Sequence, residues 1–185
     1  LIDLPVGPTA KIRSDLEFAQ YQNYFSLVGK AFGIHVETLK TTGTQPLGKG
    51  IGPALEAKDI LAVLRNEQQA PIDLKNKALD LAGILLEFGG KALPNQGVYL
   101  ARQILESGDA LNKFLAICKA QGGFKEPKTA SLTQEIVALC NGGITEIDNR
   151  NLAKVAKLAG APHDPAAGIE FFAKLGTSVV KGQPL

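Results

Sequence analysis

Thr42 to Asp59 reads Thr-Gly-Thr-Gln-Pro-Leu-Gly-Lys-Gly-Ile-Gly-Pro-Ala-Leu-Glu-Ala-Lys-Asp, and the rest of the chain is organised around this stretch. Residues 34–39 before it open with the apolar and polar alternation of a half-buried strand, and the apolar residues after it recur at helical spacing. Pro53 suits a first helical position, because its missing amide hydrogen would have no partner there. The stretch therefore predicts a strand, a glycine loop and a helix, as in an α/β fold.

Three glycines, Gly48, Gly50 and Gly52, alternate with other residues in this loop. They leave backbone amides and carbonyls uncovered, so the loop can hold an anion on its amides or a cation on its carbonyls. A tight strand-to-helix turn is the ordinary alternative. The spacing is not that of a dinucleotide-binding loop, and Lys49 is not followed by the Ser or Thr of a Walker loop.

The composition is that of an ordinary globular protein, with 45% hydrophobic and 21% charged residues among 185 and a net charge of +2. No basic run or long apolar stretch suggests nucleic acid or a membrane as a partner. The two cysteines, Cys118 and Cys140, lack metal or redox spacing, which favours a cytoplasmic protein with reduced thiols.

Predicted strands and helices alternate in residues 1–66. Ser14 predicts a helix cap, and Asn141-Gly142 predicts a hairpin turn. The expected helices are Asp15–Phe32, Pro53–Asn66, Asp73–Phe88, Gln96–Glu106, Asp109–Gln121 and one capped by Asp148 that ends at Leu158; the expected strands are residues 1–6, 34–39, 136–140, 144–147 and those around Leu175.

A search for catalytic side chains finds almost nothing. The chain has two histidines, His35 and His163, in a predicted strand and a proline-rich loop, and it has no nucleophile elbow. We therefore assign no catalytic residue.

Three stretches nevertheless carry a family resemblance. Gln45-Pro-Leu-Gly-Lys-Gly-Ile-Gly-Pro-Ala-Leu-Glu-Ala-Lys-Asp59 resembles thymidine and pyrimidine-nucleoside phosphorylases, especially the branch that includes archaeal AMP phosphorylases. Ile2-Asp-Leu-Pro-Val-Gly-Pro-Thr-Ala-Lys-Ile-Arg-Ser14 is similar to the strand and turn after that branch's base-binding helix. Glu146-Ile-Asp-Asn-Arg-Asn-Leu152, with Gly160-Ala-Pro162 and Lys181-Gly-Gln-Pro-Leu185, is similar to the start of the family's C-terminal domain.

With the alternation of elements, the resemblance implies an α/β fold, a mixed sheet with packed helices, in residues 1–130. A truncated α+β C-terminal piece would follow in residues 131–185. The family's phosphate loop, Lys-x-Ser-Thr-Gly-Gly, is absent from this sequence. We therefore expect a fragment of a thymidine phosphorylase, a pentosyltransferase that cleaves pyrimidine nucleosides with inorganic phosphate, and expect the fragment itself to be inactive. The alternatives are a nucleoside 5′-monophosphate (AMP-type) phosphorylase and a non-catalytic α/β assembly module.

The resemblance also implies particular sites. Lys11 and Ile12 align with residues that border the nucleoside pocket, and a lysine there suits a phosphate group better than an apolar base. The carbonyls of Leu47 and Gly50 and the carboxylate of Asp59 align with ligands of a potassium ion. The family further implies nucleoside or nucleotide and phosphate as substrates, no other cofactor, and a homodimer or higher homo-oligomer.

Overall fold

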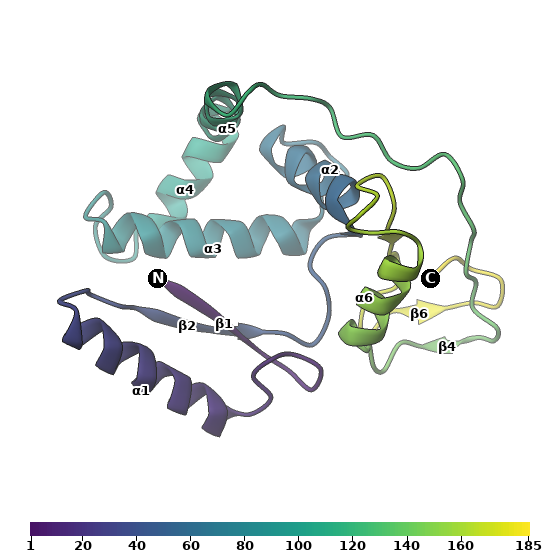
Figure 1. Ribbon diagram of the computed structural model, residues 1–185, viewed down its shortest axis with the longest axis horizontal. Helices are drawn as coiled ribbons and strands as arrows, with labels where there is room; N and C mark the ends of the chain where they lie inside the picture. Colours follow the sequence, from purple (N-terminus) through teal and green to yellow (C-terminus); the bar gives the residue numbers. More distant parts are fainter. The chain divides into compact units, whose positions relative to one another are not determined.

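The computed structural model describes all 185 residues, which form two compact units (Figure 1). Unit 1 comprises residues 1–46, 135–153 and 172–185, and unit 2 comprises residues 47–134 and 154–171. None of the helices is both long enough and apolar enough to cross a membrane. The α/β class is confirmed, and the strands pair as three separate two-stranded sheets, one parallel and two antiparallel.

Unit 1 opens with β1 (Ile2–Val6), α1 (Asp15–Ala31) and β2 (Thr38–Thr42). β1 and β2 are parallel, with Ile2 opposite Thr38 and Val6 opposite Thr42, and α1 packs against both strands. The strand expected at residues 34–39 is therefore placed too early. The amide of Ile34 donates to the carbonyl of Gly29 and closes the end of α1. Residues 34–37 therefore connect α1 to β2 and do not belong to the strand.

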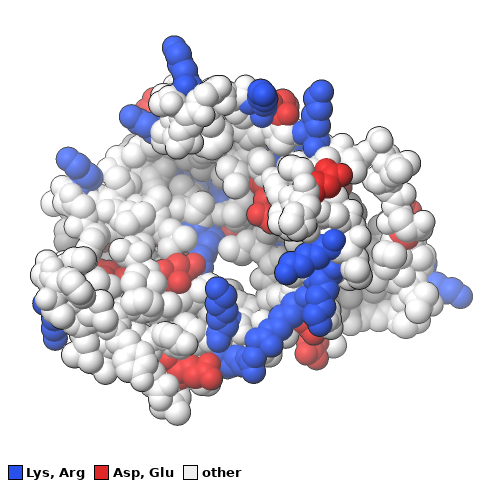
Figure 2. Space-filling model, in the orientation of Figure 1, with Lys and Arg blue, Asp and Glu red and all other residues white.

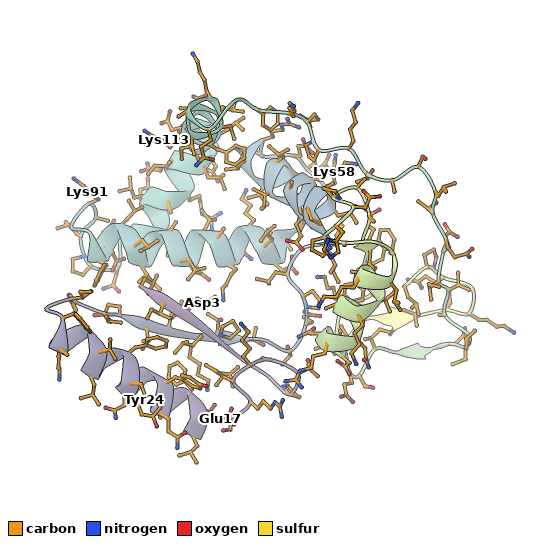
Figure 3. All side chains as sticks on the ribbon, viewed as in Figure 1. Asp3, Glu17, Tyr24, Lys58, Lys91 and Lys113 are labelled. Atoms are coloured by element: carbon orange, nitrogen blue, oxygen red, sulfur yellow. The ribbon has the colours of Figure 1, made fainter.

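The predicted cap of α1 is confirmed. Ser14 is extended, and its hydroxyl accepts from the amide of Glu17 at 3.2 Å. The Glu17 carboxylate accepts from the amide of Arg13, one residue before the cap, rather than from Ser14. Figure 3 shows Glu17 in the first turn and Tyr24 further along the same helix. Tyr24 is 58% exposed, so the apolar face of α1 is only partly covered within unit 1.

The predicted hairpin around Asn141-Gly142 is wrong. Its strands are not formed: β4 (Gly142–Gly143) pairs antiparallel with β6 (Ser178–Val179), and Val137 bridges Pro184. The amide of Lys181 donates to the Asn141 side chain at 2.8 Å, so this turn residue helps to hold the distant partner. The strand expected around Leu175 is displaced as well, because Leu175 and Gly176 form a turn and β6 begins at Ser178.

Unit 2 contains four consecutive helices, and the six predicted helices of the whole chain are confirmed to within two residues. Val63, Leu79, Ala101 and Leu105 form its buried core. α3 and α4 approach closely at Gly83 and Gly97, where a Cβ on Gly97 would overlap the carbonyl of Gly83. The elements are β3 (Gly50–Ile51), α2 (Pro53–Leu64), α3 (Ile72–Phe88), α4 (Gly97–Glu106), α5 (Asp109–Ala120) and β5 (Ile169–Glu170), which pairs antiparallel with β3; α6 (Asn149–Leu158) begins in unit 1 and ends in unit 2.

Candidate functional site

The predicted substrate residues lie on a short turn that follows β1. The amide of Gly7 donates to the carbonyl of Ile12 at 3.0 Å, and the amide of Ala10 donates to the carbonyl of Gly7 at 3.1 Å. Ile12 is buried, with 6% of its surface exposed, and forms a parallel bridge with Val6. Lys11, the neighbouring residue, is exposed. The turn thus buries the aliphatic side chain in unit 1 and leaves the ammonium in solvent.

This turn touches the segment that follows β2. The amide of Gly43 donates to the carbonyl of Val6 at 2.8 Å. A Cβ on Gly7 would lie 2.6 Å from the carbonyl carbon and oxygen of Gly43, so the two backbones meet where a side chain would not fit. The carboxyl ends of both parallel strands are thereby fixed together, and this is the edge at which open α/β sheets bind ligands.

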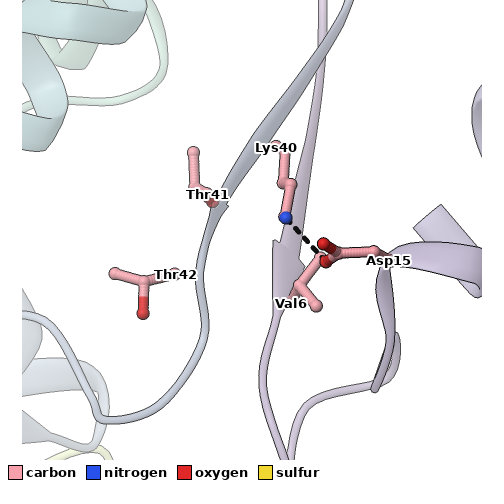
Figure 4. A pocket seen from close by; sticks show the side chains of 5 residues that line it. All are labelled: Val6, Asp15, Lys40, Thr41 and Thr42. Carbon is pink, nitrogen blue, oxygen red and sulfur yellow. Dashed lines mark hydrogen bonds and ion pairs between the residues drawn. The ribbon is translucent and has the colours of Figure 1, made fainter. Parts of the chain in front are cut away.

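An open hollow of about 400 Å³ lies at the same edge, lined by Val6, Asp15, Lys40, Thr41 and Thr42 (Figure 4). The Lys40 ammonium donates to Asp15 at 2.6 Å, so the carboxylate at the start of α1 offsets its charge. The hydroxyl of Thr41 donates to Asp3 at 2.7 Å. A neutralised lysine beside an exposed carboxylate gives this hollow little preference for an anion.

The start of α6 reaches the turn and the Gly43 segment together. The side-chain amide of Asn149 donates to the carbonyl of Gly43 at 2.9 Å, and its backbone amide donates to the hydroxyl of Thr9 at 3.3 Å. The Arg150 guanidinium donates to the carbonyls of Thr9 and Ala10 at 3.3 and 3.4 Å. The Arg150 side chain therefore holds the backbone just before Lys11, and Asn149 holds the Thr9 hydroxyl and the neighbouring Gly43 carbonyl.

These two residues were missed at the sequence level, although both lie in a quoted motif. Asp148 was predicted as the cap of this helix, and the structure confirms it, since its carboxylate accepts from the amides of Arg150 and Asn151. The cap fixes which residues occupy the first turn. One feature of the sequence could have indicated their role. Asn149 and Arg150 follow the cap residue directly, and both have side-chain hydrogen-bond donors that the cap does not use.

The other predicted site is the glycine loop of unit 2. Asp59 belongs to α2, and its carboxylate contacts this loop: Oδ2 accepts from the amides of Lys49 and Gly50 at 2.6 and 2.7 Å. Gly48 has φ of +73°, and a Cβ there would lie 2.5 Å from the same oxygen. The Glu56 carboxylate accepts from the amide of Gly52 at 3.1 Å. Two carboxylates of α2 thus fasten the loop that precedes it.

A potassium ion would have to share Asp59 with these amides. Oxygen ligands suit such a hard cation. The Asp59 carboxylate contacts the loop that carries the carbonyls of Leu47 and Gly50. Both amide bonds use Oδ2, so the residues fit the ion only if the carboxylate offers it Oδ1. No group of three or more His, Cys, Asp or Glu residues is arranged to hold a metal.

On the face that Figure 2 shows, several lysine and arginine side chains adjoin one another in the lower middle of the view, with acidic side chains beside them, and the other basic side chains are scattered. One ion pair is bidentate: the guanidinium of Arg65 donates to both oxygens of Glu126 at 2.9 Å. The hydrogen bond from Arg65 lowers the pKa of Glu126 from its ordinary value of 4.5. This pair holds the irregular segment 122–134 to α2 and has a structural role.

Comparison with known proteins gives a consistent result. Residues 143–185 match the sequence model of the pyrimidine nucleoside phosphorylase C-terminal domain. Over all 185 residues the chain is 53% identical to the "Putative thymidine phosphorylase" of Hahella chejuensis, and 49% identical to that of Parvibaculum lavamentivorans. It is 50% identical to "Putative thymidine phosphorylase 1" of Cupriavidus necator. The chain spans 36–37% of the length of these relatives.

Proposed function

Because the chain belongs to the thymidine and pyrimidine-nucleoside phosphorylase family, we propose that the protein containing it is a pentosyltransferase that cleaves thymidine and related nucleosides. The observation that carries this proposal is the 53% identity that extends over the whole chain. The chain supplies part of the substrate cleft and is inactive alone, since it offers no side chain suited to the chemical step.

The reaction joins an oxygen of inorganic phosphate to the anomeric carbon of the sugar and breaks the bond from that carbon to the base nitrogen. The base leaves with the electron pair and takes up a proton, and the sugar leaves as its 1-phosphate. An enzyme speeds this step by placing the anion beside the developing positive charge of the sugar. In this proposal, the turn of residues 7–12 borders the nucleoside, and inorganic phosphate binds to residues outside this chain.

A second candidate is a phosphorylase for nucleoside 5′-monophosphates. Lys11 favours it, because an exposed ammonium on a flexible stem meets a phosphate as a point charge and is a poor wall for an apolar base. The turn also lies at the carboxyl edge of the parallel strands, where a ligand is expected.

Specificity constants separate the candidates. These 185 residues would replace the matched segment of the Hahella chejuensis relative, and phosphorolysis of thymidine, uridine, AMP and CMP would be measured. If Lys11 contacts a 5′-phosphate, Lys11→Ala lowers kcat/KM for the nucleotides about tenfold and leaves the nucleosides unchanged. Lys91→Ala, an exposed lysine of unit 2, is the matched control.

Three other results decide between the readings. Preference for nucleosides, with a ratio that Lys11→Ala does not change, refutes the nucleotide candidate and leaves the thymidine phosphorylase. Phosphorolysis of none of the four by a folded chimera contradicts both enzymes and favours the non-catalytic assembly module. A preference for AMP or CMP that depends on Lys11 replaces the first candidate by the second.

We further propose that the glycine loop holds the potassium ion through Asp59 and the carbonyls of Leu47 and Gly50. A cation bound there would neutralise the carboxylate and fix the loop. The thermal midpoint of the chimera should rise with potassium more than with the same concentration of a larger organic cation. Asp59→Ala should remove that difference, and an unchanged potassium response would refute the site.

We also propose that the protein works as a homodimer or higher homo-oligomer. Sedimentation equilibrium of the chimera tests this directly, and a monomer at micromolar concentration would contradict it.

A further inference from the structure

Three segments that are distant in sequence meet at the carboxyl edge of β1 and β2. They are the turn of residues 7–12, the segment at Gly43 and the first turn of α6. The turn itself contains two backbone hydrogen bonds, from Gly7 and Ala10. Asn149 and Arg150 add three bonds to it and a fourth to Gly43. Most of the hydrogen bonds that hold this edge thus come from residues more than 100 positions away.

We propose that Asn149 and Arg150 are positioning residues that set the conformation of the turn of residues 7–12 and so direct Lys11 toward the substrate. The claim that Lys11 points toward the substrate rests on the function proposed above. The claim that Asn149 and Arg150 hold the turn rests on the contacts alone. Neither residue touches the reacting atoms.

The contacts of Arg150 fall on the two peptide units just before Lys11. One guanidinium donates to the carbonyls of both Thr9 and Ala10, which fixes the orientation of two successive peptides. The direction of a side chain follows the backbone that precedes it, so rotation of these peptides would swing the lysine. A lysine at position 150 would keep the charge and lose the fork that reaches both carbonyls.

Asn149 fixes the other side of the same edge. Its Nδ2 donates to Gly43, and its Oδ1 is buried and accepts no hydrogen bond. The carbonyl of Gly43 accepts only, so the amide orientation is set by this contact. Asn149→Asp would keep the shape and place a carboxylate oxygen against that carbonyl, which turns an attraction into a repulsion.

Hydrogen exchange of the folded chimera gives a readout that does not depend on activity. Loss of a hydrogen bond from a charged group should raise the opening equilibrium about tenfold. Arg150→Ala should therefore speed exchange at Gly7 and Ala10 about tenfold and leave the core helices of unit 2 unchanged. Arg102→Ala, an exposed arginine of α4, is the matched control and should change neither region. Unchanged exchange in residues 7–12 for both Arg150→Ala and Asn149→Asp would overturn the proposal.

Kinetics of the chimera separate positioning from general damage. A misplaced Lys11 loses binding to the ground state and the transition state alike, so Arg150→Ala should raise KM for the preferred substrate about tenfold at similar kcat. Unfolding of part of the protein would instead lower the apparent kcat at constant KM, and that result refutes the positioning role. Arg150→Lys should recover only part of the lost affinity, whereas full recovery would show that charge alone matters.

Failure of the function proposed above gives a different pattern. If Lys11→Ala changes no substrate ratio while Arg150→Ala still speeds exchange and raises KM, the turn is positioned for a purpose other than phosphate recognition. If Lys11→Ala changes the substrate ratio and Arg150→Ala changes neither exchange nor KM, the turn keeps its conformation without Arg150 and the positioning role is wrong.

Discussion

The two turns that carry the candidate site residues differ in the origin of the side chains that hold them. In the glycine loop of unit 2, Asp59 and Glu56 bind amides that lie 4 to 10 residues before them. In the turn of residues 7–12, Asn149 and Arg150 bind groups that lie 140 or 141 residues earlier. The side chains that hold the first turn come from the helix that follows it, and those that hold the second come from a helix about 140 residues later.

This difference matters for how each turn forms. Closing a loop of ten residues costs less conformational entropy than closing one of about 140, and by Jacobson–Stockmayer scaling the gap is about 2 kcal/mol. The carboxylate contacts of the glycine loop can therefore form with α2 alone, although its strand β3 also pairs with the distant β5. The side-chain contacts of the turn of residues 7–12 form only when α6 is in place. A site at the second turn is consequently sensitive to changes far away in the sequence.

The largest expected effect comes from breaking the local turn sterically. Gly52 has φ of +134°, and a Cβ there would lie 2.5 Å from the carbonyl oxygen of Ala167. Gly52→Ala adds backbone strain to a clash with backbone, so we expect it to lower the free energy of unfolding of unit 2 by about 3 kcal/mol. Denaturant unfolding followed by circular dichroism measures this loss.

Gly90→Ala separates the two causes. Gly90 also has positive φ, +66°, but a Cβ there would meet nothing within 4 Å. It should cost about 1 kcal/mol, the cost of the left-handed conformation alone. Equal losses for the two substitutions would show that the approach of Ala167 is not what constrains the glycine loop.

A smaller effect should follow when the local fastening is removed but the glycines stay. Asp59→Ala deletes both amide contacts of the carboxylate, and we expect it to lower the free energy of unfolding by about 2 kcal/mol. Exchange should rise at Lys49 and Gly50 and stay constant at Gly7 and Ala10. Asp80→Ala, on the exposed face of α3, is the control and should be nearly neutral.

The same contrast explains what the sequence predicted. The helices were found because each is specified by residues close together: Ser14 and Asp148 cap their helices, and apolar spacing marks the rest. The loop from Gly48 to Gly52 was recognised for the same reason. Family resemblance added the turn with Lys11 and Ile12, which spacing alone does not mark as a site.

The pairing of strands was not predictable in this way. Asn141-Gly142 has the sequence of a tight hairpin, yet Gly142 and Gly143 pair with Ser178 and Val179. Exposed glycines supply no side chains that would select a partner, so the register depends on backbone contacts of the folded unit. Asn149 and Arg150 were missed similarly, because their side chains donate to backbone carbonyls, which every residue carries.

The segment of residues 122–134 offers a prediction about pH. The hydrogen bond from Arg65 lowers the pKa of Glu126, so the pair stabilises the folded state above the ordinary pKa of 4.5 and is lost as pH falls through the lowered value. Protection of amides near residue 126 should therefore fall on acidification below pH 4.5, as pH passes through the lowered pKa. Glu126→Gln should show the low protection already at pH 7 and little further change, whereas a normal acid response in that variant would assign the effect to another group.

The smallest expected effect concerns the ion pair at the hollow beside β1 and β2. Lys40 and Asp15 are separated by 2.6 Å, but their side chains are 45% and 81% exposed. Such a pair gains little because water screens the charges and two flexible side chains must be ordered, so Lys40→Ala should change stability by less than about 0.5 kcal/mol. If the hollow binds no ligand, the variant should also keep the substrate ratios of the chimera. A loss of affinity without a loss of stability would show that this lysine exchanges its aspartate for a substrate, and the candidate site would then include the hollow as well as the turn of residues 7–12.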